Sequence, residues 1–187
     1  MSPFWPRIFA KLAVDADRRV RENVHKAHGL LASKLGRNLA PQLKELMGVW
    51  YTSQCDPHSP AAGEAARSLR ACFSNNAKLA DAVAFCRVEI LGHVHDCLFD
   101  NGDVSDEQKE RVLVGALAGY SLLLRQHDGA ETDAAMEKHR QLWARPEMYR
   151  LVSKDVGTGP TKQAWFRAVT SMSQSFPQLV RGELQPP

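Results

Sequence analysis

WPRIFAKLAVDADRRVRENVHKAHGLLASKL, residues 5–35, sets the plan that the rest of the chain repeats. Its apolar side chains recur every three or four positions, the spacing of one face of an α-helix: Trp5, Ile8, Phe9 and Leu12 in the first half, and Val20, Val24, Ala27, Leu31 and Leu35 in the second. Residues 14–17 leave room only for a tight turn between these runs, and Asp17 is placed to cap the second helix. The stretch therefore predicts a helical hairpin.

Within this hairpin, Asp15 in the turn and Arg21 near the start of the second helix have the spacing found in HEAT repeats. In that repeat the two residues pair as a rung between stacked hairpins. We interpret Asp15 and Arg21 as a structural rung, because buried ion pairs more often set register than perform chemistry.

Further amphipathic helices follow along the chain. We expect a helix with Pro41 in its first turn, one beginning at Ser59, and one long helix that follows Asn76 and runs to Cys97. Ser105 with Gln108 predicts the start of the next helix as a capping box, and a shorter helix lies before Pro146. Residues 153–160 read as a loop before a last helix that stops at Pro177.

No window shows the sustained alternation of a β-strand, so the predicted fold class is all-α. We expect about four antiparallel helical hairpins stacked in a HEAT/ARM-like α-solenoid, as a single domain over residues 1–187. Its apolar ends suggest a fragment of a longer array. No apolar run reaches the roughly 20 residues of a transmembrane helix and no signal peptide is visible, so we expect no membrane and a cytosolic location.

Charge is unevenly distributed. The whole chain has a formal charge of +3, but residues 1–45 alone contain nine lysine or arginine and four acidic side chains, a net charge of +5. Such an asymmetry is typical of a chain that meets an anionic partner with one end. A simple solvated helix face is the alternative.

Residue patterns of enzymes and metal sites are missing from the sequence. The cysteines at 55, 72, 86 and 97 form no C-x-x-C pair, and His93 with Cys97, or His25 with His28, give two candidate ligands where a zinc site needs three or four. No phosphate-binding glycine loop, nucleophile elbow or H-E-x-x-H motif occurs. We therefore expect a binding scaffold with no catalytic residue, no metal and no cofactor.

Several motifs together resemble the N-terminal domain of the listerin family: PFWPRI (3–8), KLAVDADRRVRE (11–22), LAPQLKELMGVW (39–50), QCD (54–56), PAA (60–62), AFC (84–86) with Glu89-Ile90, and FPQL (176–179). The resemblance spans nearly the whole chain and is strongest up to residue 90. Listerins are RING-type E3 ubiquitin ligases of ribosome-associated quality control, built as long HEAT/ARM solenoids with a zinc-binding RING at the far end.

The resemblance implies a domain that docks on a large ribosomal subunit carrying a stalled nascent chain. In the family this domain lies near the sarcin–ricin loop and touches the nuclear export mediator factor, while the distant RING ubiquitinates the nascent peptide. The RING cysteines are absent from this sequence. Ligase activity and E2 binding are therefore expected only of a parent protein, not of this segment.

We expect Arg18, Arg19 and Lys26 to contact ribosomal RNA phosphate or an acidic protein face, because such contacts supply affinity and salt dependence. Trp50, Tyr51 and Trp143 are candidates either for an interface or for the core. Two other functions stay open: a generic HEAT-repeat adaptor that binds an acidic peptide, and a DNA-repair enzyme on a HEAT-like scaffold, which requires a catalytic carboxylate in a basic groove.

Overall fold

The computed structural model describes residues 4–100, 102, 104–126 and 131–179, and ten α-helices with two 3-10 helices account for most of them. In chain order they are α1 (Trp5–Ala13), α2 (Arg18–Leu35), η1 (Gly36–Gln42), α3 (Leu43–Thr52), η2 (Ser53–Cys55), α4 (Ser59–Cys72), α5 (Asn76–Phe85), α6 (Arg87–Phe99), α7 (Asp106–Arg125), α8 (Asp133–Trp143), α9 (Pro146–Arg150) and α10 (Gly159–Ser175). The described part of the chain contains no strand, which confirms the all-α prediction.

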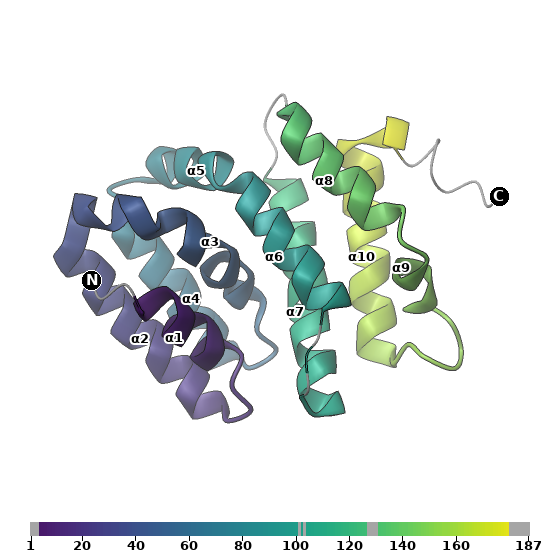
Figure 1. The fold of residues 1–187 in the computed structure, drawn as a ribbon, viewed down its shortest axis with the longest axis horizontal. Helices are drawn as coiled ribbons and strands as arrows, with labels where there is room; N and C mark the ends of the chain where they lie inside the picture. Colours follow the sequence, from purple (N-terminus) through teal and green to yellow (C-terminus); the bar gives the residue numbers. More distant parts are fainter. Residues whose placement is uncertain (1–3, 101, 103, 127–130, 180–187) are drawn as a thin grey trace.

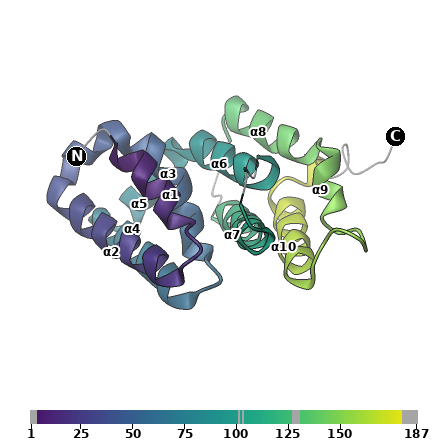
Figure 2. The same cartoon turned by 60° about the horizontal axis from the view of Figure 1, so that its bottom comes forward.

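The helices form two layers (Figures 1 and 2). One layer contains α1, α3, α6 and α8, and the other contains α2, α4, α7 and α10. In the second layer α2 packs most extensively on α4, and α7 on α10. This is the arrangement of stacked antiparallel hairpins that the solenoid prediction requires.

Local sequence sets most helix ends. The side chain of Asp17 accepts a hydrogen bond from the backbone N–H of Arg19 at 2.8 Å, and the hydroxyl of Ser105 accepts one from Gln108 N–H at 3.3 Å. Both predicted N-caps are confirmed. The predicted capping box is only half formed, because the side chain of Gln108 donates to the Val14 carbonyl at 2.8 Å and does not return to Ser105. The second helix ends at Gly36, whose φ of 50° lies in the region that favours glycine.

Two predicted boundaries were wrong. Pro41 lies in η1, and α3 begins only at Leu43. The expected long helix to Cys97 is broken at Cys86 into α5 and α6. The backbone N–H of Cys86 closes α5 on the carbonyl of Ala82 at 3.0 Å, and the Cys86 carbonyl accepts from Ile90 at 2.9 Å to begin α6. The break lets the two helices bury different faces.

The core runs through both layers. Its largest fully buried side chains in the first half are Phe9, Trp50 and Tyr51, and in the second half Tyr120. Small residues bring α2 and α4 close together: a Cβ added at Gly29 would lie 2.8 Å from the Cβ of Ser68. Every helix in the described ranges is too short or too polar to cross a bilayer.

Candidate docking surface

Arg18 and Arg19 lie together in the first turn of α2, next to the α1–α2 turn, and both are exposed. The side chain of Arg19 is 81% exposed and reaches the Asp17 carboxylate at 3.5 Å. Arg18 forms no hydrogen bond or ion pair with any described residue. The two guanidinium groups are thus available to a partner at one edge of the molecule.

Lys26 differs from the two arginines. It lies about 12 Å further along α2, and its Nζ forms an ion pair with Glu22 Oε1 at 2.5 Å. The hydrogen bond to Glu22 raises the pKa of Lys26, and the same bond lowers the pKa of Glu22. Lys26 therefore presents a charge that is already largely compensated.

The position of the arginines is unfavourable for the helix itself. The N-terminal end of a helix carries a partial positive charge from its unpaired N–H groups, and cations there are destabilising. Asp17 offsets part of this: the backbone N–H of Arg19 lowers the pKa of the Asp17 carboxyl, with the Arg19 side chain and the charge of Arg18 acting in the same direction. Two arginines at this position therefore gain no stability from the dipole of α2.

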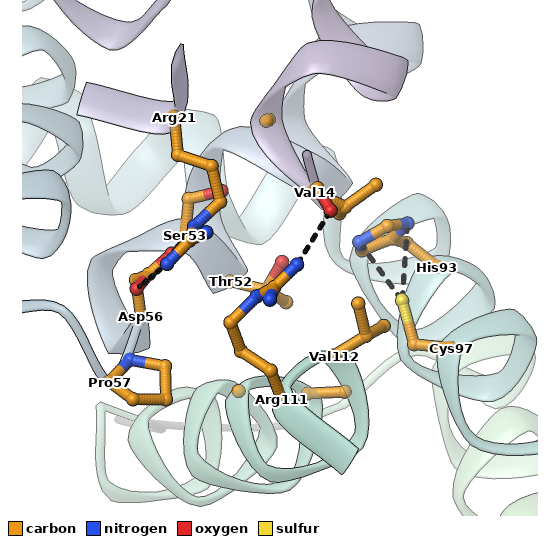
Figure 3. A pocket seen from close by; sticks show the side chains of 13 residues that line it. Val14, Arg21, Thr52, Ser53, Asp56, Pro57, His93, Cys97, Arg111 and Val112 are labelled. Carbon is orange, nitrogen blue, oxygen red and sulfur yellow. Dashed lines mark hydrogen bonds and ion pairs between the residues drawn. The ribbon is translucent and has the colours of Figure 1, made fainter. Parts of the chain in front are cut away.

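Behind this surface, Arg21 forms the structural rung, but with a different carboxylate from the predicted one (Figure 3). Its Nε donates to Asp56 Oδ2 at 2.7 Å and its Nη2 to Asp56 Oδ1 at 3.2 Å, and both side chains are buried. Asp15 takes part only through its backbone carbonyl, which accepts from Arg21 Nη1 at 2.8 Å. The Asp15 carboxylate instead accepts from the N–H of Asp17 at 2.8 Å.

Two residues of α7 hold the same turn, and sequence reasoning missed them. Arg111 Nη2 donates to the carbonyls of Val14 at 2.8 Å and Asp15 at 2.9 Å, and Gln108 Nε2 donates to Val14 at 2.8 Å. Arg111 lines a cavity of about 40 Å³. In Figure 3 it lies between the Arg21–Asp56 pair and the pair of His93 and Cys97. The sequence feature that could have indicated this role is that Arg111, like Arg21, lies near the start of its helix. These contacts fix the α1–α2 turn against α7.

The same cavity contains His93 and Cys97, whose Nε2 and Sγ lie 3.4 Å apart. Burial lowers the pKa of His93 to about 4 and raises that of the Cys97 thiol to about 12, so both are neutral at pH 7. A thiol in this state is a poor nucleophile. No group of three or more histidine, cysteine or acidic residues within the described ranges is arranged to hold a metal ion.

The aromatic candidates lie in the core. Trp50 is fully buried and donates to Ser68 Oγ at 2.7 Å, and Tyr51, 1% exposed, donates to Gln126 Oε1 at 2.7 Å. Trp143 is 4% exposed and donates to the hydroxyl of Tyr120 at 3.0 Å. These side chains are satisfied inside the protein and are not placed to stack on a partner.

Comparison with known proteins gives the family. A family model described as "E3 ubiquitin-protein ligase listerin, N-terminal domain" matches residues 1–186. The chain is 34% identical to an E3 ubiquitin-protein ligase listerin of Mus musculus and 33% identical to those of Gallus gallus and Xenopus tropicalis, in each case over 97% of the chain. It spans only 11% of the length of these relatives. The chain belongs to the listerin N-terminal domain family.

Proposed function

We propose that this chain is the part of a listerin-type E3 ubiquitin ligase that docks on a stalled large ribosomal subunit in the cytosol. Arg18 and Arg19 contact ribosomal RNA phosphate, and the stacked hairpins hold the rest of the ligase in a fixed direction from that contact. A nuclear export mediator factor-like protein is the expected neighbour. Ubiquitin transfer is carried out by a RING elsewhere in the parent protein, which also binds the E2 enzyme.

The observation that carries this proposal is the exposed arginine pair at the start of α2: Arg18 has no ion-pair partner among the described residues, and Arg19 reaches only the Asp17 carboxylate, at 3.5 Å. It lies where it does not help the helix, as described above, and phosphate oxygens are the usual partners of paired guanidinium groups. Lys26 adds less, because Glu22 already neutralises it.

The anchoring of the α1–α2 turn also favours a docking role. Arg21 binds this turn from α2, and Arg111 and Gln108 bind it from α7. A turn tied at several points presents its neighbouring charges in one geometry, so less conformational entropy is lost on binding.

The test is co-sedimentation of the 187-residue chain with purified large ribosomal subunits at rising salt. We expect the wild-type chain to pellet at low salt and to be released as salt rises, because phosphate contacts release counterions. The double variant Arg18→Glu, Arg19→Glu should be released at clearly lower salt.

The matched control is Lys154→Glu, Arg167→Glu, which makes the same change in net charge at exposed positions near and on α10, far from the start of α2 (Figure 1). This control should pellet like wild type. Equal pelleting of the wild-type chain and the Arg18→Glu, Arg19→Glu variant would refute the arginine pair as the docking surface.

A further inference from the structure

A second surface feature lies at the opposite end of α2, where η1 meets the link between α4 and α5. Figure 1 shows α5 along the upper edge of the molecule, opposite the α1–α2 turn at the lower edge. Here a cavity of about 340 Å³ opens to the surface, with Leu39, Leu43, Cys72 and Phe73 on its apolar wall. Leu39 is buried, and the other three are partly buried against the core. Its volume is at the small end of the range for ligand pockets, about 300–1,000 Å³.

Both charged residues that line this pocket are basic. Arg37 in η1 and Lys78 in the first turn of α5 are exposed, and neither side chain forms a hydrogen bond or ion pair with a described residue. No acidic side chain is among the described residues of the lining. Asp81, one turn along α5 from Lys78, forms no ion pair with it. By contrast, Lys44 nearby in sequence is paired with Glu89 at 2.8 Å.

We infer that this pocket binds an acidic segment of a partner protein, which inserts one bulky apolar side chain against Leu39 and Phe73 and places carboxylates on Arg37 and Lys78. The charge of the rim selects an anionic partner, and the apolar wall selects a protein. A contact to RNA phosphate alone needs cations but no apolar wall, whereas protein interfaces are centred on a buried apolar or aromatic anchor.

The pocket and the arginine pair are separate surfaces. The 18 residues of α2 lie between them, a distance of roughly 27 Å along the helix axis. One domain can therefore hold an RNA surface at one end and an acidic protein at the other. The pocket can bind its partner whether or not Arg18 and Arg19 meet RNA.

The probe is a set of short fluorescein-labelled peptides, each with a central leucine, phenylalanine or tryptophan flanked by aspartate and glutamate. We expect binding of members of this set to the 187-residue chain by fluorescence anisotropy. Peptides with amides in place of the carboxylates, or with serine in place of the apolar residue, should bind at least about tenfold more weakly, a loss of about 1.4 kcal/mol or more in binding free energy.

Cys72 gives an independent readout of position, because it lies in the pocket wall and is a free thiol. A bound peptide should slow alkylation of Cys72 by N-ethylmaleimide, measured by mass spectrometry, and leave the rates at Cys55 and Cys97 unchanged. The variant Arg37→Glu, Lys78→Glu should lose peptide binding and this protection. Both positions are exposed, so the fold is retained, and circular dichroism checks it.

The Arg18→Glu, Arg19→Glu variant should bind the peptides like wild type, whereas Arg37→Glu, Lys78→Glu should leave ribosome sedimentation unchanged. These two results separate the pocket from the proposed docking surface. The inference is overturned if no acidic-apolar peptide of the set binds, if binding survives in Arg37→Glu, Lys78→Glu, or if a uridine oligonucleotide protects Cys72 and the peptides do not.

Discussion

The buried rung gives the sharpest prediction of stability, because it decides which carboxylate holds Arg21. Asp56 binds Arg21 through two charge-assisted hydrogen bonds of 2.7 and 3.2 Å, and its Oδ1 also accepts from the N–H of His58 at 2.7 Å. The side chains of Arg21 and Asp56 are 4% and 9% exposed. The substitution Asp56→Ala leaves the buried guanidinium without a carboxylate, bonded only to the carbonyls of Asp15 and Ala16. It should therefore lower the free energy of unfolding by about 3–5 kcal/mol.

The matched control is Asp15→Ala. Arg21 uses only the backbone carbonyl of Asp15, which the substitution keeps, while the carboxylate makes one exposed hydrogen bond to the N–H of Asp17. We therefore expect a loss of at most about 1 kcal/mol. The intermediate variant Asp56→Asn keeps an acceptor for His58 but loses the charge, and should fall between the two.

The assay is urea unfolding of each variant, followed by tryptophan fluorescence and by circular dichroism. A double-mutant cycle of Asp56→Ala with Arg21→Met should show strong coupling, because removing both partners eliminates the unpaired charge. Equal losses for Asp15→Ala and Asp56→Ala would refute this description of the rung, and would favour the pairing expected from HEAT spacing alone.

Burial, close packing and helix charge each give a further prediction of stability. Burial lowers the pKa of His28 to about 3, so below about pH 6.5 the unfolded chain binds a proton that the folded chain does not. The free energy of unfolding should therefore fall as the pH drops from 6.5 towards 3. Urea midpoints measured at pH 7 and pH 5 check this. Gly29→Ala should lower the free energy of unfolding by about 1–3 kcal/mol, because the added Cβ would lie 2.8 Å from the Ser68 Cβ in α4. Gly63→Ala should raise it by about 0.5–1 kcal/mol, because nothing lies within 4 Å of a Cβ at that position. Urea unfolding should therefore show changes of opposite sign for the two variants. Arg18→Glu with Arg19→Glu should leave the melting temperature unchanged or slightly higher, since acidic residues suit the start of a helix, and a large fall would show that the pair serves the fold.

The fold was predictable from the sequence where its determinants are local. The caps at Asp17 and Ser105 act within a few residues of the helix ends that they set, and both were correctly placed. The pairing of Lys26 with Glu22 was not predicted, although the two residues have the spacing of four at which helical ion pairs form.

The rest depended on contacts between distant parts of the chain. Arg21 and Asp56 are 35 residues apart, and Arg111 lies 97 residues from the Val14 carbonyl that it binds. No glycine or proline marks the break between α5 and α6 at Cys86. The two helices pack on different neighbours, α5 on α4 and α6 on α3, α7 and α8, and the sequence pattern does not show this. Of the candidate site, the sequence indicated the exposed arginines, but not the contacts that fix their turn.

We propose that the edge of the molecule next to the α1–α2 turn contacts ribosomal RNA. Ala16 is exposed in that turn, between Asp15 and Asp17, and a photoreactive benzophenone amino acid placed there tests the claim most directly. On illuminated complexes with large ribosomal subunits, we expect a covalent adduct to ribosomal RNA from position 16 and none from the same group at Lys154. Adducts to RNA from position 154 alone, or only to protein from position 16, would contradict the account.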